Sequence, residues 1–163
     1  MIHRADSPAC RSAFSILFSI AWLLLPALPA AATDKTDVMA TVRHFVDSFN
    51  QGDVKAIAAA CADQASILDE FAPYEWHGAG ACAKWTDDFD ADAKKNGITD
   101  TVVSIGAPRH VDISGDRAYV VVSANYKFKQ HSKPVQEVGS TLTIALQKTD
   151  GHWLMTGWAW AKR

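Results

Sequence analysis

The sequence predicts an α+β fold in which three N-terminal helices pack on a strongly curved antiparallel sheet, giving a cone shape. Two observations lead to this prediction. Apolar residues recur with a helical period before Gly97 and alternate with polar ones after it. The alternating part is rich in Val, Thr, Tyr and Trp, and short turn sequences divide it into antiparallel neighbours. Because a bent sheet wrapped on helices leaves a cavity at its wide end, we expect a ligand site there.

Residues 1–32 have the pattern of a secretory signal peptide. Two arginines precede the apolar stretch 13–25, and small residues end at Ala32. As a helix the apolar stretch rises only about 20 Å, whereas the hydrocarbon of a membrane is roughly 30 Å thick. We therefore expect cleavage near Ala32, a mature domain of residues 33–163, and a periplasmic or secreted location without stable membrane insertion.

The first half of the mature chain contains the expected helices. Thr36 and Asp37 offer a cap for a helix that ends at Gly52, and Asp53 caps the next one. Gly97 ends the third helix. The helices are expected at 38–51, 54–61 and 79–96, with short strands at 66–69 and within the loop 71–78.

The second half contains the strands. Tight turns at 114–116 and 149–151 join antiparallel neighbours, and Pro134 lies in a longer polar connection, 130–136. The strands are expected at 101–107, 111–113, 117–128, 138–148 and 153–161.

Four segments of the mature chain carry a family resemblance. They are FNQGD at 49–53, CADQASILD at 61–69, WHG at 76–78 and GHWLMTGW at 151–158. In this order and spacing they resemble the nuclear transport factor 2-like superfamily, in particular its SnoaL-like and ketosteroid isomerase-like branches. The resemblance covers essentially the whole mature chain and implies one small-molecule pocket inside the cone.

The resemblance makes Asp69 the candidate general base, because the catalytic Asp of ketosteroid isomerases follows the same phrase. An Asp whose pKa is raised by a pocket can abstract a proton next to a carbonyl. The donors of those isomerases would fall on Phe45 and near Thr143. Phe45 cannot donate a hydrogen bond, so a steroid-type isomerase is not expected.

Asp69 and Glu70 would point to opposite faces of a strand, and we expect Asp69 to face the cavity. The alternative is that both cap the loop that begins at Phe71. Tyr74, His77 and Tyr126 are the candidate supporting donors of an acid–base site.

Aromatic side chains are the candidate ligand-binding groups. Trp158 and Trp160 share strand parity and therefore a face, whereas Trp153 has the opposite parity. Rings on the concave face would suit a flat apolar ligand, and rings on the outer face would suit dimer contacts. The expected ligand-binding residues are Phe45, Trp76, Tyr126, Trp158 and Trp160.

Cys61 and Cys82 are the cysteines of the mature chain. In an oxidising compartment such a pair predicts a disulfide, here between the ends of two helices. Two buried free thiols are the alternative.

Composition and spacing argue against other classes. Lys and Arg number 16 and Asp and Glu 18, without a basic cluster, so nucleic acid is not an expected partner. The histidines show no ligand spacing, and the sequence has no phosphate loop or serine-nucleophile motif, so we expect neither a metal nor a cofactor.

Three hypotheses remain for the function. The first is an exported domain, expected to be a homodimer, that binds a small, partly apolar organic molecule in the cone cavity. The second is an isomerase-, dehydratase- or cyclase-type enzyme with Asp69 as general base. The third is a dimeric interaction module without a ligand.

Overall fold

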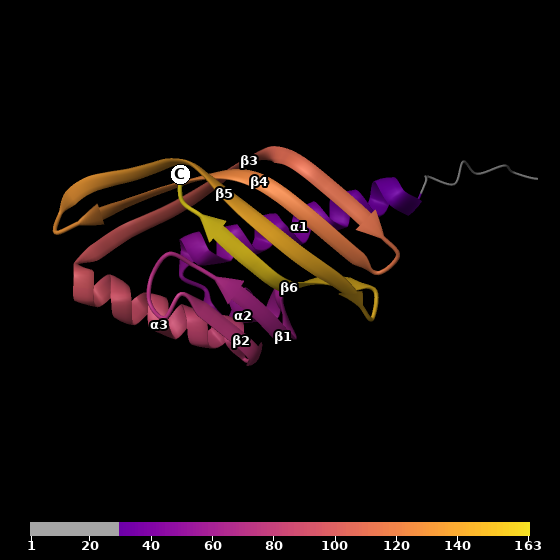
Figure 1. The fold of residues 1–163 in the computed structure, drawn as a ribbon, viewed down its shortest axis with the longest axis horizontal. Helices are drawn as coiled ribbons and strands as arrows, with labels where there is room; N and C mark the ends of the chain where they lie inside the picture. Colours follow the sequence, from indigo (N-terminus) through magenta and orange to yellow (C-terminus); the bar gives the residue numbers. More distant parts are fainter. Residues whose placement is uncertain (1–29) are drawn as a thin grey trace, which may run out of the picture.

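The computed structural model describes residues 30–163 and confirms the predicted α+β class (Figure 1). No helix in the described part is long and apolar enough to cross a membrane. The predicted signal peptide lies outside the described residues except for residues 30–32, which are in the first helix. The elements are α1 (Ala30–Gln51), α2 (Val54–Ala59), β1 (Cys61–Leu68), β2 (Glu75–Ala79), α3 (Ala81–Asn96), β3 (Ile98–Ser114), β4 (Arg117–Gln130), β5 (Lys133–Thr149) and β6 (His152–Ala161).

The strands form one sheet in the order β2-β1-β6-β5-β4-β3. Strands β1 and β6 are parallel, and every other neighbouring pair is antiparallel. Figure 1 shows the long strands β3 to β5 as a bent band, with α3 below its left-hand end. Helix α1 packs against β3 and β6, and α3 packs against β1, β2 and β3. The helices therefore lie on the inner side of a curved, unclosed sheet.

One part of the space between α1 and the sheet is solidly packed. Val38 and Val42 of α1 are 0 % and 1 % exposed, and Ile144 and Leu146 of β5 are buried to the same extent. These residues occupy the helical and alternating apolar positions of the sequence. Periodicity alone therefore located this part of the core.

Several element boundaries differ from the sequence expectation. Helix α1 begins at Ala30, before the expected cap at Thr36 and Asp37, because the alanines there are strong helix formers. Helix α2 ends at Ala59, so that Cys61 is the first residue of β1 and does not end a helix. The expected strands at 101–107 and 111–113 are one strand, β3, with shifts of register along it.

The expected polar connection around Pro134 is part of β5. His131 and Ser132, with φ of 48° and 67°, form a tight turn directly after β4. Pro134 is tolerated because β6 pairs with β5 only from Thr141 onward. Proline lacks the N–H that a second neighbour would need, so it belongs at such an unpaired edge.

A bulge in β5 changes which side chains face inward. Gly139 has no partner residue on β4, its φ is +82°, and its N–H donates to the Oδ1 atom of Asn125 at 3.0 Å. Beyond Gly139 towards the C-terminus, Leu142 faces the inside. On the other side of the bulge the alternation is reversed, so Val138 is 60 % exposed and Glu137 turns inward.

A second irregularity has the same effect in β6. Thr156 is skipped in the pairing of β6 with β5. Trp158 and Trp160 share a face as predicted, but the prediction that Trp153 faces the other way is wrong. Trp153 and Met155 are buried in the same core as Trp158, because the extra residue restores their inward direction.

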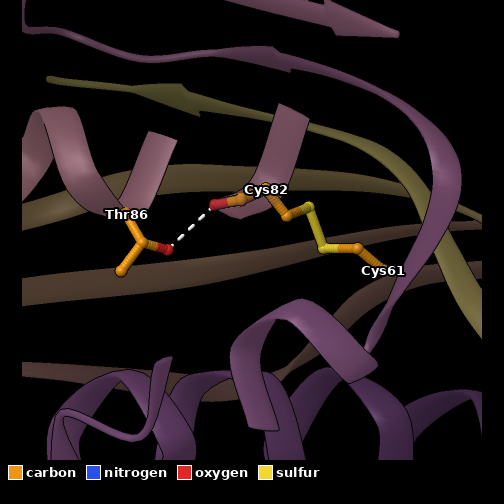
Figure 2. Close-up of a disulfide and its surroundings, with 3 residues drawn as sticks. All are labelled: Cys61, Cys82 and Thr86. Carbon is orange, nitrogen blue, oxygen red and sulfur yellow. Dashed lines mark hydrogen bonds between the residues drawn. A yellow bond between two sulfur atoms is a disulfide. The ribbon is translucent and has the colours of Figure 1, made fainter. Parts of the chain in front are cut away.

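The predicted disulfide joins β1 to α3. Figure 2 shows the bond between Cys61, at the start of β1, and Cys82, in the first turn of α3. Both cysteines are buried, and the Oγ1 hydroxyl of Thr86 donates to the Cys82 carbonyl at 2.9 Å. The bond therefore fixes the start of α3 to the strand that ends just before Asp69.

Candidate functional site

A cavity of about 330 Å³ lies between α1, α3 and the inner face of the sheet. Every major layer contributes to its wall, because residues of α1, α3, β3 to β6 and the loop after β1 all line it. Nine of the nineteen residues that line it are aromatic. Its rings are Phe45, Phe49, Phe71, Trp85, Phe89, Tyr126, Phe128, Trp158 and Trp160.

The rings support one another across the elements. Trp85 of α3 meets Trp158 of β6 edge to face, with centroids 4.8 Å apart, and Phe45 of α1 lies 5.9 Å from Trp158. Tyr126 of β4 lies 6.3 Å from Trp160 of β6. Such pairs stabilise by more than their buried area alone. The wall is therefore held in shape by contacts between helices and sheet.

Asp69 is the acid that the sequence singled out, and it lines this cavity. It follows the end of β1, where its Oδ2 atom accepts a hydrogen bond from the Nε1 of Trp85 at 2.8 Å. Its Oδ1 atom accepts from the backbone N–H of Glu70 at 2.7 Å, and its own N–H donates to the Tyr74 carbonyl at 3.0 Å. Asp69 therefore both closes the loop 69–74 and presents a carboxyl to the cavity.

Burial raises the pKa of Asp69 to about 6. The hydrogen bonds from Glu70 and Trp85 act in the opposite direction, and the charge of Glu137 raises the pKa further. An acid with this pKa is mostly ionised at neutral pH. Because its pKa is close to that pH, it can both accept a proton and release it again at a small cost in free energy. It is suited to general acid–base chemistry.

Three charged groups meet near the wall. Lys162 Nζ contacts the Oε1 atom of Glu137 and lies 3.3 Å from Oε2 of Glu70. Burial and then the charge of Glu137 raise the pKa of Glu70, while Lys162 lowers it. The hydrogen bond to Glu137 raises the pKa of Lys162. The expectation that Asp69 and Glu70 face opposite sides is wrong, because both follow the end of β1 and line the cavity.

Tyr126 faces Glu137 across the pairing of β4 with β5. Its hydroxyl is buried and has no hydrogen-bond partner among the residues that the structure describes. Burial raises the pKa of Tyr126 far above its ordinary value, and the charges of Glu137, Asp69, Glu70 and Asp92 raise it further. The hydroxyl is therefore a proton donor that stays neutral, in a strongly negative environment.

Three residues predicted for the site do not line this cavity. Trp76 is buried, but its Nε1 donates to Asp88 at 2.8 Å on α3. Tyr74 is exposed in the loop after Asp69, and His77 is exposed on β2, 3.3 Å from Glu75. Strand β2 pairs only with β1 and is the edge of the sheet, so its outward side chains meet solvent.

Within residues 30–163 no group of three or more His, Cys, Asp or Glu side chains is arranged to hold a metal ion. The side chains that line the cavity supply an acid of raised pKa, a buried phenol and several aromatic rings.

A family model described as a SnoaL-like domain matches residues 38–159, which span α1 to β6 and include most of the cavity wall. The chain belongs to the SnoaL-like domain family.

Solved structures resemble this SnoaL-like domain throughout its fold. A nuclear transport factor 2-like superfamily protein from Salmonella enterica superposes with a TM-score of 0.69 at 9 % identity, covering 81 % of this chain and 92 % of that one. A ketosteroid isomerase-like protein from Erwinia carotovora gives 0.62 at 17 % identity, with 78 % and 94 % covered. At such identities the likeness shows the nuclear transport factor 2-like fold alone. No curated protein matches the sequence significantly.

In this SnoaL-like domain the two positions at which ketosteroid isomerases have their hydrogen-bond donors carry other side chains. Phe45 lines the cavity as a ring, and Thr143 does not line it. Glu137, on the same strand as Thr143, brings a carboxyl to the wall instead. Sequence reasoning missed Glu137 because simple alternation from Leu142 directs it outward. Gly139, an isolated glycine within a strand, was the signal that a bulge reverses the alternation.

Proposed function

We propose that this SnoaL-like domain binds a small, partly apolar organic molecule in the cavity. The observation that carries the proposal is the cavity itself, about 330 Å³ in volume and walled by rings from α1, α3 and the sheet. An apolar cavity with a few polar groups is the usual form of a ligand site. This open, ring-lined space favours ligand binding over an interaction module without a ligand.

A pair of variants on β3 tests whether the cavity is the binding site. Val103 lines the cavity, whereas the neighbouring Val102 is 48 % exposed. We expect tryptophol, a flat neutral alcohol, to bind the wild type and Val102→Trp with similar affinity in calorimetric titrations. Val103→Trp should weaken binding at least about tenfold, because the indole fills the cavity. Equal affinity for both variants would show that binding occurs elsewhere.

A second candidate function is acid–base catalysis of the isomerase, dehydratase or cyclase type. The position of Asp69 favours it, because a carboxyl with a pKa of about 6 lies in the wall of the cavity beside aromatic rings. Such a reaction needs a neutral hydrogen-bond donor. Tyr126 can supply one, since its buried hydroxyl is neutral. Tyr74 and His77 have no part in this proposal because they lie outside the cavity.

Hydrogen–deuterium exchange of 2-tetralone tests proton abstraction directly. The wild type should accelerate exchange of the protons next to the carbonyl, with a rate that rises with pH through about 6 as Asp69 ionises. Asp69→Asn should abolish the acceleration and leave tryptophol binding nearly unchanged. Asp63→Asn, an exposed acid on β1, is the control and should behave like the wild type. Undiminished exchange in Asp69→Asn would remove Asp69 from the chemistry.

Export to the periplasm or out of the cell is part of the proposal. The disulfide between Cys61 and Cys82 supports it, because such bonds persist in oxidising compartments. Fractionation of cells that express the full chain tests this point, and recovery of the uncleaved chain in the cytoplasm would contradict it. The predicted homodimer remains a prediction that sedimentation of the purified domain can test.

A further inference from the structure

The charges of the cavity are unequal. Among the described lining residues, four are acidic, namely Asp69, Glu70, Asp92 and Glu137, and only Lys162 is basic. Lys162 cannot neutralise them all, and its side chain is 55 % exposed at the mouth. Carboxylates combined with aromatic faces attract organic cations through charge-assisted hydrogen bonds and through the ring quadrupole.

Glu137 has one carboxylate oxygen paired and one without a hydrogen-bond partner among the described residues. Its side chain is only 8 % exposed, and its Oε1 atom accepts from Lys162. Its Oε2 atom is buried and has no hydrogen-bond partner in the described part of the chain, and the neighbouring carboxyl of Glu70, whose pKa Glu137 raises, approaches it with a second negative charge. A buried carboxylate oxygen in this state costs free energy that a donor from a ligand would recover.

The groups around Glu137 favour a cationic donor over the alternatives. An anion would meet the carboxylates of Asp69, Glu70 and Asp92 in the same wall. A neutral alcohol could donate one hydrogen bond but would leave the excess charge in place. Burial is the main cause of the raised pKa of Tyr126, which faces Glu137, and the charges of Glu137 and Asp69 raise this pKa further.

We propose that the molecule bound in this cavity carries a protonated amine on a flat apolar body, with the ammonium group held at Glu137. The body packs on the rings of α1, α3 and β6, which line the same space. This inference rests on the proposed function, since it names the class of molecule that the cavity takes.

Three probes that share one ring system separate the two proposals. Tryptamine, tryptophol and indole-3-acetate carry a positive, a neutral and a negative end group on the same indole. In calorimetric titrations at neutral pH we expect tryptamine to bind at least about tenfold more tightly than tryptophol, and indole-3-acetate to bind most weakly. Equal affinities of tryptamine and tryptophol would overturn the amine inference and leave the proposed function standing. Failure of all three probes to bind would count against both.

Two variants assign the preference to Glu137. Glu137→Gln should reduce tryptamine affinity about tenfold and change tryptophol affinity less than about twofold. The matched control is Glu75→Gln, which removes an acid whose side chain is 61 % exposed on β2 and should change neither affinity. A full preference for tryptamine in Glu137→Gln would overturn the assignment.

Lys162→Gln gives a change in the opposite direction, which misfolding would not produce. Removing the ammonium group of Lys162 takes a positive charge from the cavity wall and breaks its ion pair with the Oε1 atom of Glu137. Tryptamine should therefore bind about three- to tenfold more tightly, with tryptophol unchanged. Weaker tryptamine binding in this variant would contradict the proposal.

Discussion

The same strands build two different ends of the molecule. At the packed end, branched aliphatic residues such as Val38, Ile57, Val120, Ile144 and Leu146 are at most 2 % exposed and fill the space between helices and sheet. At the cavity end, rings and carboxyl groups stand on the continuation of β4, β5 and β6 around about 330 Å³ of open space. The two ends share one sheet and differ in what its inner face carries.

In this fold, stability and ligand binding depend on different regions of the molecule. Branched aliphatic side chains interdigitate and pack as densely as the molecules in an organic crystal. Flat rings can line a wall without filling the space that it encloses. Of the six buried side-chain polar atoms without a partner among the described residues, four belong to residues that line the cavity, namely Tyr126, Glu137, Trp158 and Trp160, and the other two belong to Ser140 and Trp153. In a core, such atoms lower the stability of the folded state. In a ligand site they can form hydrogen bonds with the ligand. We therefore expect substitutions to affect stability mainly at one end and binding mainly at the other.

The largest effect should come from shortening one leucine of β5. Leu146 is 1 % exposed within the packed core, whereas Leu142, 3 % exposed, borders the cavity. Leu146→Ala should lower the free energy of unfolding by about 3–5 kcal/mol and Leu142→Ala by about 2 kcal/mol, since Leu142 has fewer contacts to lose. Urea unfolding measures both. Equal losses would show that the cavity end is packed as tightly as the other.

Removing the disulfide should have the next largest effect. Cys61 and Cys82 are 21 residues apart, so the double variant Cys61→Ala/Cys82→Ala should lose about 3 kcal/mol of stability. It should also loosen Trp85, which donates to Asp69 from the next turn of α3. Intact mass of the protein, alkylated without reductant, checks the bond. Two alkyl adducts would contradict it.

The buried acid should make the cavity end sensitive to pH. The pKa of Asp69 is about 6 in the folded protein against an ordinary 3.8, so the folded state keeps a proton that the unfolded state releases. The free energy of unfolding should therefore fall as pH rises from about 4 to about 6, by up to about 3 kcal/mol, and this contribution should stay lost above pH 6.

Asp69→Asn isolates this contribution. The stability of the variant relative to the wild type should rise between about pH 4 and pH 7, on top of a pH-independent loss, because an amide can accept only one of the two hydrogen bonds from Glu70 and Trp85. Asp63→Asn, an exposed acid on the same strand, should show no such pH-dependent gain. Parallel pH profiles of the wild type and Asp69→Asn would contradict the raised pKa.

The smallest effect on stability should come from two glycines with the same backbone conformation. Gly139 and Gly151 both have φ of +82°, so an alanine at either should cost about 1–2 kcal/mol. A Cβ atom at Gly139 would meet only the flexible Arg163, and one at Gly151 would meet nothing within 4 Å. Only Gly139→Ala should also weaken tryptamine binding, because the bulge at Gly139 directs Glu137 inward. Equal binding by both variants would show that the bulge does not control the site.

Part of the candidate site could be predicted because it lies on regular or family-like segments. Helical spacing put Phe45 on the inner face of α1, and the family phrase at 61–69 led to Asp69. Glu70 and Lys162 carried no such signal, since they line the cavity from positions just beyond the ends of β1 and β6. Trp76 was expected at the cavity as one of several large rings, and its partner Asp88 could be known only from the packing of α3 on β2.

The amino-acid sequence alone was enough for the α+β class, the order of helices and strands and the fact that Trp158 and Trp160 share a face. It predicted the bond between Cys61 and Cys82 with free thiols as the alternative, and the structure contains the bond. The tertiary structure alone decided that Glu137 and Trp153 turn inward. In a regular strand the side chains point to alternate faces from one residue to the next, so the sequence predicts the face of each residue. A bulge adds one residue that has no partner on the neighbouring strand, and the faces are reversed beyond it. That register exists only in the assembled sheet, and it brings to the cavity an acid with one oxygen that lacks a partner among the described residues.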